Sequence, residues 1–297
     1  MKPLEITPHQ STSKHSRLIK STSRVGALVA LTFLAACQSP PMRSAVPSTS
    51  PDEVGELRKG TGYLNGYLKR DQYPDSLALL PAPPAEGSVQ AKSDLEYHQA
   101  GKKLRATSRG DLAAKDSVLK YPAFAQTFSC ALDVQMGTDA TPHLNMLIRR
   151  SWIDAGLATY GAKNLYQRKR PFVVLHEGTC VPKDEAKLAK DGSYPSGHSA
   201  LGWGVGLILA SIAPERGKEL LDRGYQFGQS RMVCGVHWQS DVDAGRLIGS
   251  ATFARLQSDP VYAAQAKLAQ QEIQAARAKG LKPSRTECDA EAAALSQ

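Results

Sequence analysis

Hydrophobic residues recur at helical spacing along most of the chain, and no stretch alternates between apolar and polar residues as a strand would. The helical pattern runs from Ser93 onward, and residues 143–165 carry a second apolar face. Residues 201–213 (LGWGVGLILASIA) are almost continuously apolar, a length that suits a central core helix rather than a membrane span. Residues 242–256 and 263–279 predict two more helices, the latter at the surface or against a partner subunit. We therefore expect an all-α fold with a single helical-bundle domain.

The first 62 residues follow a different pattern. A basic stretch ends at Arg24, and residues 25–36 (VGALVALTFLAA) form an apolar run that ends before Cys37. Its length is typical of a signal-peptide core. Residues 37–62 are rich in serine and proline and lack apolar periodicity, which predicts a flexible tether. We therefore divide the chain into a signal peptide (1–36), a tether (37–62), a globular domain (63–262) and a C-terminal helix and tail (263–297).

The segment before the tether carries a targeting motif. Leu34–Cys37 (LAAC) resembles a bacterial lipobox, in which the cysteine is diacylated and becomes the first residue of the mature protein. An ordinary signal peptide cut near Cys37 is the alternative. Gln38 makes the site similar to those of lipoproteins sent to the outer membrane. The resemblance implies an exported, periplasmic protein anchored to the outer membrane through Cys37.

Charge and cysteine content narrow the function classes. The net charge is +9, but no run of lysines and arginines is interleaved with aromatics, so we expect no nucleic-acid partner. The basic excess fits the attraction of small phosphorylated substrates. The four cysteines other than Cys37 predict two disulfides in an exported chain, with free buried thiols as the alternative. Cys180 with Cys234 is our first pairing because they flank the polar clusters; Cys130 with Cys288 would then tie the tail to the body.

The first polar cluster is residues 163–171 (KNLYQRKRP). Lys163 and Arg170 are seven residues apart, so on one helix their side chains would leave the same face. Pro171 is expected to stop that helix, with Arg170 in its last turn. A guanidinium binds two phosphate oxygens in a fork and an ammonium adds a point charge. The alternative is a solvated basic face, to which Arg168 and Lys169 would belong.

The second cluster is residues 192–199 (GSYPSGHS). Pro195 and Ser196 precede the long apolar helix and can start it. Gly197 allows the backbone to approach a ligand closely, and the free N–H groups of the helix start make an anion site. His198 lies at that site, where it can reach a leaving-group oxygen. A capping or core histidine is the alternative.

The third cluster is residues 230–241 (SRMVCGVHWQSD), in which Arg231 supplies a third cation. His237 and Asp241 are four residues apart, so they face the same way on a continuous helix; a helix starting near Ser240 would still place Asp241 below His237. The carboxylate can accept from one ring nitrogen and leave the other free as a nucleophile. The alternative is a helix-start salt bridge.

The order and spacing of these clusters are more specific than any one of them. The pattern Lys-x6-Arg-Pro, Pro-Ser-Gly-His and Ser-Arg-x5-His-x3-Asp resembles the phosphatidic acid phosphatase type 2 (PAP2) superfamily, which includes the vanadium haloperoxidases. The octet GSYPSGHS and the stretch GQSRMVCGVHWQSDVDAGR are similar to bacterial class A non-specific acid phosphatases. The resemblance covers about residues 73–270, including PDSLALLPAPP (74–84), whose apolar-proline part (77–84) is expected to be extended. It implies a helical bundle of the PAP2/haloperoxidase type.

The resemblance also implies a role for each residue. His237 would be the nucleophile that forms a phosphohistidine, His198 the acid and later the base, and Asp241 the group that orients His237. The residues holding the phosphate oxygens would be Lys163, Arg170, Ser196, Gly197 and Arg231. No metal or cofactor is expected. Ser199 stands where relatives usually have threonine, a change that keeps the hydroxyl and should matter little. Val236 stands where relatives often carry a larger side chain, and this departure bears on substrate preference but not on the reaction.

The function predicted is a metal-independent acid phosphatase for small phosphomonoesters such as nucleotides, sugar phosphates or aryl phosphates. It would act at mildly acidic pH, with phosphate transfer to alcohols as a side reaction. One alternative is a vanadium haloperoxidase, which would use the same cations to bind vanadate. Another is a non-catalytic lipoprotein that binds phosphate or a nucleotide. A homo-oligomer is compatible with all three.

Overall fold

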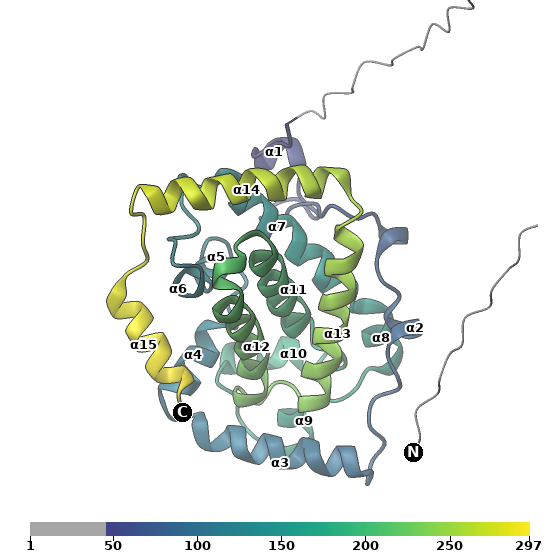
Figure 1. Ribbon diagram of the computed structural model, residues 1–297. Coiled ribbons are helices and arrows are strands. Elements are labelled where there is room, and N and C mark those ends of the chain that lie inside the picture. Colours follow the sequence, from purple (N-terminus) through teal and green to yellow (C-terminus); the bar gives the residue numbers. More distant parts are fainter. Residues whose placement is uncertain (1–45) are drawn as a thin grey trace, which may run out of the picture. The chain divides into compact units, whose positions relative to one another are not determined.

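The computed structural model describes residues 46–297, and the regular elements of this part of the chain are helices (Figure 1). Its one β-type pairing is an isolated bridge between Glu56 and Leu64, so the predicted all-α class is confirmed. Among these residues no helix has both the length and the apolar character needed to cross a membrane. The predicted signal peptide, Cys37 and the start of the tether lie outside the described residues. Residues 51–54 of the predicted tether form a short helix.

The α-helices follow one another along the chain, and the longest connection, residues 55–75, lies between the first two. They are α1 (Pro51–Val54), α2 (Ser76–Leu79), α3 (Val89–Leu104), α4 (Ser108–Lys115), α5 (Ala123–Gln126), α6 (Ser129–Leu132), α7 (Pro142–Leu157), α8 (Tyr160–Tyr166), α9 (Pro171–Leu175), α10 (Glu185–Leu188), α11 (Gly197–Ile212), α12 (Gly217–Val233), α13 (Gln239–Leu256), α14 (Pro260–Ala278) and α15 (Arg285–Leu295).

Helix α11, the predicted core helix, lies at the centre of the bundle. It packs against α7, α12 and α13, and Figure 1 shows it between α12 and α13. Its apolar side chains, including Val205, Ile208 and Leu209, are buried in the main hydrophobic core. Burying each such side chain stabilises the fold by about 1.5–3 kcal/mol. This helix is therefore a rigid support for the polar residues at its N-terminus.

Close packing of α13 on the start of α11 depends on glycine. A Cβ at Gly245 would lie 2.4 Å from the carbonyl oxygen of Ser196, and one at Gly249 would lie 2.4 Å from that of Ala200. The backbones can therefore approach, and the Ser196 N–H donates to the Asp241 carbonyl at 2.9 Å. Two of the three polar clusters meet at this contact.

Replacing Gly245 with alanine is expected to lower the free energy of unfolding by about 1–3 kcal/mol, because the new methyl group must push α13 away from backbone atoms. Thermal and urea unfolding would measure the loss. Gly217→Ala is the matched control, since a Cβ there meets nothing within 4 Å. Equal unfolding free energies for the two variants would contradict this account of the helix contact.

Three expectations about the helices need correction. Residues 143–165 form two helices, α7 and α8, separated by a turn at residues 158–159. Residues 76–79 are helical rather than extended, because the Asp75 carboxylate accepts from the Leu77 N–H and caps α2. The helical pattern expected from Ser93 onward is interrupted after α4, since residues 116–122 form no helix. The tail helix α14 does form, and it buries Tyr262, Ala269 and Ile273 in the core.

Both predicted disulfides are confirmed. Cys180 pairs with Cys234, and Cys130 pairs with Cys288 across 158 residues of sequence. The first joins the segment after α9 to the end of α12, close to the third polar cluster. The second attaches α15 to α6, so the C-terminal helix is covalently held to the bundle. Cross-links over such separations stabilise a fold by about 2–4 kcal/mol each.

Candidate active site

The first cluster does not form the predicted helix. Helix α8 ends at Tyr166, Gln167 adopts a left-handed conformation with φ of 43°, and Pro171 begins α9 instead of ending a helix. Proline is well suited to this first helical position because it has no N–H to satisfy. Arg170 is therefore the extended residue that precedes α9, not part of the last turn of α8.

Lys163 and Arg170 nevertheless converge. The Lys163 ammonium donates to the Gly192 carbonyl at 2.6 Å, and the Arg170 guanidinium reaches the same oxygen at 3.4 Å. Their side chains are only 4 % and 3 % exposed. Asp191, which the sequence did not single out, places Oδ2 3.1 Å from Arg170 and 3.6 Å from Lys163. Burial lowers the pKa of Lys163 to about 8 and also lowers the pKa of Arg170.

The second cluster forms the predicted helix start. Ser196 is the N-cap of α11 and Gly197 is its first residue. The Ser196 Oγ accepts from the Ser199 hydroxyl at 2.9 Å and from the Ser199 N–H at 3.3 Å, so its own proton is free to be donated. Ser199 thus supplies the hydroxyl expected at its position. A Cβ at Gly197 would meet only Thr159 Oγ1, at 3.7 Å, so no protein atom requires glycine there.

His198 follows in the first turn of α11. Its Nε2 lies 3.2 Å from the carbonyl oxygen of Ser117, and because a carbonyl only accepts, Nε2 carries a proton. Burial and the nearby Arg231 hold the pKa of His198 well below its ordinary value. The other ring nitrogen, Nδ1, is therefore the one available for proton exchange.

Arg231 lies near the end of α12 and is 1 % exposed. Its Nε and NH1 have no hydrogen-bond partner among the described residues. Burial, reinforced by the positive charge of Arg170, lowers the pKa of Arg231 to about 9. Unpaired buried donors are rare because each costs about 1–3 kcal/mol. Such donors next to other cations indicate an anion-binding site.

His237 and Asp241 take the second of the two predicted arrangements: His237 precedes α13, and Asp241 lies in its first turn. Nδ1 of His237 lies 3.4 Å from Oδ2 of Asp241 and 3.3 Å from Oγ of Ser193. Nε2 accepts from Arg170 at 2.9 Å, so Nε2 holds the lone pair and Nδ1 the proton. Burial, followed by Arg170 and Lys163, holds the pKa of His237 well below its ordinary value.

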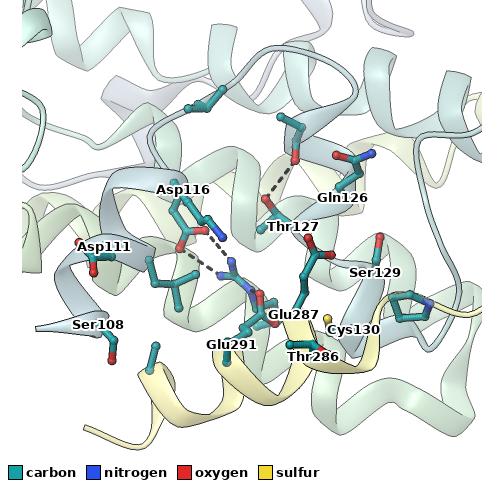
Figure 2. Close-up of a pocket in the computed structure, with 18 of the residues that line it drawn as sticks. Ser108, Asp111, Asp116, Gln126, Thr127, Ser129, Cys130, Thr286, Glu287 and Glu291 are labelled. Atoms are coloured by element: carbon teal, nitrogen blue, oxygen red, sulfur yellow. Dashed lines mark hydrogen bonds and ion pairs between the residues drawn. The ribbon is translucent and has the colours of Figure 1, made fainter.

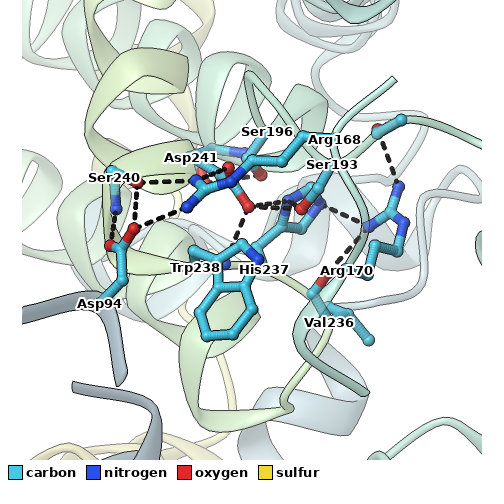
Figure 3. A network of polar contacts seen from close by, with 12 residues as sticks. Asp94, Arg168, Arg170, Ser193, Ser196, Val236, His237, Trp238, Ser240 and Asp241 are labelled. Carbon is cyan, nitrogen blue, oxygen red and sulfur yellow. Dashed lines mark hydrogen bonds and ion pairs between the residues drawn. The ribbon is translucent and has the colours of Figure 1, made fainter. Parts of the chain in front are cut away.

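The Asp241 carboxylate is held by several donors (Figure 3). The Trp238 N–H donates to Oδ2 at 2.8 Å, and the Ser193 hydroxyl donates to the same oxygen. Since the Ser193 oxygen can still accept from His237, the carboxylate acts on the imidazole both directly and through Ser193. Ser193 belongs to the GSYPSGHS octet, but no pattern in the sequence pointed to this role.

Arg168 and Asp94 form a second set of contacts, which holds the other carboxylate oxygen of Asp241. Arg168 donates to Oδ1 of Asp241 at 2.6 Å and to Asp94 of α3 at 2.8 Å. Asp94 also accepts from the Ser240 N–H at 2.8 Å and from its hydroxyl at 2.6 Å. Figure 3 shows the Arg168 guanidinium between the two carboxylates. Arg168, whose side chain is 14 % exposed, is therefore a largely buried bridge, whereas the alternative interpretation of the sequence placed it on a solvated face.

The structure thus gathers the predicted residues around one site. It presents three buried cations, a serine hydroxyl at a helix start, one imidazole with its lone pair at Nε2 and a second with an exchangeable Nδ1. Val236, the second departure noted in the sequence, is fully buried, and its carbonyl accepts from Arg170 at 3.0 Å. The arrangement can bind a tetrahedral anion and attack it with a neutral imidazole.

Comparison with known proteins gives consistent relatives. Residues 142–262 match the model of the PAP2 superfamily. The chain is 46 % identical to a non-specific acid phosphatase of Providencia stuartii over 208 residues, which cover 70 % of this chain and 84 % of that protein. It is 42 % identical to a non-specific acid phosphatase of Salmonella typhimurium, covering 63 % and 76 % of the two chains. An acid phosphatase of Zymomonas mobilis is 37 % identical, covering 74 % and 83 %.

Proposed function

The chain belongs to the bacterial class A acid phosphatases of the PAP2 superfamily, and from this we propose that it hydrolyses phosphate monoesters through a phosphohistidine at His237, without a metal. One observation carries the proposal: the lone pair of a neutral His237 Nε2 lies against buried Arg170. A nucleophile in this state attacks without first losing a proton, and the cations stabilise the charge that develops on phosphorus oxygens.

Substrate binding uses the cations and the start of α11. Lys163, Arg170 and Arg231 hold the phosphate oxygens, with the Ser196 hydroxyl and the Gly197 N–H as further donors. The three cations and Ser196 are buried before substrate arrives, and Gly197 is held at the start of α11, so little reorganisation is needed in the transition state. The ligand also explains the glycine at 197, since the bound oxygen would occupy the space next to its backbone.

The first chemical step transfers the phosphoryl group. Nε2 of His237 forms a bond to phosphorus while the bond from phosphorus to the ester oxygen breaks, and protonated His198 gives the Nδ1 proton to the leaving oxygen. Asp241 and Ser193 hold the proton on Nδ1 of His237 and stabilise the positive charge of the phosphorylated ring.

The second step returns the enzyme to its starting state. Neutral His198 accepts a proton from water at Nδ1, the water oxygen bonds to phosphorus, and the phosphorus–nitrogen bond breaks. Inorganic phosphate leaves and His198 ends protonated. An alcohol that replaces this water would receive the phosphoryl group, which gives the phosphotransferase side reaction.

The proton states require acidic conditions. In the free protein, burial and Arg231 favour neutral His198, but the mechanism needs it protonated. A bound phosphate dianion offsets the cations and raises the pKa of His198. Low pH adds to this effect, so turnover is expected to decline as pH rises through the pKa of His198.

The N-terminal segment bears on where in the cell the enzyme acts. The apolar run at residues 25–36 and the LAAC motif support export to the periplasm and a lipid anchor on Cys37 at the outer membrane. The substrates are small phosphomonoesters. No nucleic-acid partner is proposed, and a homo-oligomer is compatible with the fold.

The test uses the full mature domain with p-nitrophenyl phosphate, a nucleotide and a sugar phosphate at acidic pH. We expect turnover of these esters to be unchanged in excess EDTA, because the residues above supply every charge the reaction needs. Activity lost in EDTA and restored by a divalent cation would contradict metal independence.

Vanadate should inhibit the phosphatase activity. Bromide oxidation by the vanadate-loaded protein would instead favour the haloperoxidase alternative. Saturable binding without turnover would favour the non-catalytic one.

A further inference from the structure

His198 depends on a carbonyl that lies just past the end of α4, where the N–H and the hydroxyl of Ser117 still donate to the Ala114 carbonyl at 3.1 and 2.6 Å. The acceptor of its Nε2 proton is the oxygen of Ser117, two residues beyond the end of α4. The preceding residue, Asp116, is 1 % exposed. Its carboxylate pairs with both terminal nitrogens of Arg223 on α12, at 2.5 and 3.2 Å, and accepts from the Ser230 hydroxyl at 2.6 Å. These contacts fix the backbone next to the acceptor of His198.

The network continues to the C-terminal helix. Nε of Arg223 lies 3.2 Å from Oε2 of Glu291 on α15. That helix is fastened by the disulfide between Cys130 and Cys288. Asp116, Arg223 and Glu291 line a hollow of about 650 Å³ between α4, α5, α6 and α15, and Figure 2 shows Asp116 and Glu291 together there. The buried guanidinium of Arg223 is thus paired with two carboxylates, Asp116 after α4 and Glu291 on α15.

Stability alone is a weak reason for such a network. Taking charges out of water costs several kcal/mol per ion, and apolar residues of similar volume often stabilise a fold as well or better. The proposed chemistry uses none of the three residues directly. What the network does achieve is a fixed position for the Ser117 carbonyl, held between α12, which carries Arg231, and α15.

We propose that Asp116, Arg223 and Glu291 are positioning residues for the general acid His198, acting through the carbonyl of Ser117. This inference rests on the proposed function of His198. The fixed carbonyl keeps a proton on Nε2 and sets the ring so that Nδ1 meets the leaving oxygen. A displacement of about 1 Å at a reacting group can cost about 100-fold in rate.

Two substrates with different leaving groups distinguish a positioning role for these residues from a merely structural one. An alkoxide is a poor leaving group and needs the proton of His198, whereas p-nitrophenolate leaves readily without it. In Asp116→Asn we expect kcat/KM for glycerol 2-phosphate to fall about tenfold to 100-fold, and that for p-nitrophenyl phosphate to stay within about threefold. Glu291→Gln changes the outer end of the network and should show the same difference between the two substrates, with a smaller loss of kcat/KM. It replaces Asp116→Asn as the test variant if that variant folds poorly.

The matched control is Glu272→Gln, which removes a carboxylate that accepts from the N–H groups of His143 and Leu144 at the start of α7. It should lower the melting temperature without distinguishing the two substrates. Equal losses for both substrates in Asp116→Asn and Glu291→Gln, or no loss in either, would overturn the positioning role. His198→Ala reports on the proposed function itself: if it shows no leaving-group selectivity, the acid role fails, whatever the other variants do.

Discussion

Replacing His237 with alanine is expected to lower kcat at least about 10⁴-fold and to abolish the phosphorylated enzyme. Removing a covalent nucleophile leaves only the binding and charge stabilisation supplied by the rest of the site. The cations still hold the substrate, so its dissociation constant should change much less than kcat. The loss should therefore fall on the chemical step.

The stability of the phosphorylated enzyme in acid and in alkali tests whether His237 is the nucleophile. A phosphohistidine is cleaved by acid and survives alkali, so the wild-type enzyme mixed with labelled p-nitrophenyl phosphate and quenched in alkali should retain label. His237→Ala should retain none. His198→Ala should retain more than wild type, because p-nitrophenolate leaves unaided while the water of the second step is no longer activated. His176→Asn, at the end of α9, is a control that should label normally. Wild-type labelling of His237→Ala would show that another residue is the nucleophile.

The sequence predicted the site best where its geometry is local. His237 and Asp241 are four residues apart, and either of the two expected helix starts brings the carboxylate below the imidazole. The start of α11 was also predicted, because Pro195 and Ser196 precede a long apolar run, although Ser196 caps the helix and Pro195 lies just before the cap. In both places, nearby residues and elementary helix geometry determine the result.

Lys163 and Arg170 of the first cluster do converge as predicted, although the helix from which this was predicted does not form. A common helix for Lys163 and Arg170 was predicted because their spacing fits one, yet the chain turns at Gln167 and Pro171 begins a new helix. The two cations meet because both reach the carbonyl of Gly192, which is more than twenty residues away. Helical spacing alone does not detect such a meeting point.

The supporting charges could not be predicted for a related reason. Arg168, Asp94 and Asp116 look like ordinary surface charges in the sequence, because their partners are separated from them by 72 or more residues. The packing of α3 against α13 brings Asp94 to Arg168, and the packing of α4 against α12 buries Asp116 beside Arg223. The cysteines were easier, because few cysteines leave few pairings and position along the chain favoured one of them.

Replacing Arg231 with methionine is expected to lower kcat/KM by about 10² to 10³, the usual cost of removing one fixed donor to a transition-state oxyanion. Stability should not fall with it. Two nitrogens of the buried guanidinium have no hydrogen-bond partner within residues 46–297, so an apolar side chain of similar length should leave the melting temperature equal or higher. Activity and stability would then change independently, as expected for a group held in place for its ligand.

The same variant should also move the pH profile. A cation disfavours the protonated form of a neighbouring imidazole, and Arg231 lowers the pKa of His198 in the free enzyme. Without it that pKa rises, so His198 stays protonated to higher pH and the decline of kcat/KM with rising pH shifts upward. Arg231→Lys keeps the charge and should leave the decline near its wild-type position while restoring part of the activity. A downward shift in Arg231→Met would contradict the acid role of His198, and a matching loss of melting temperature would attribute the lost activity to unfolding.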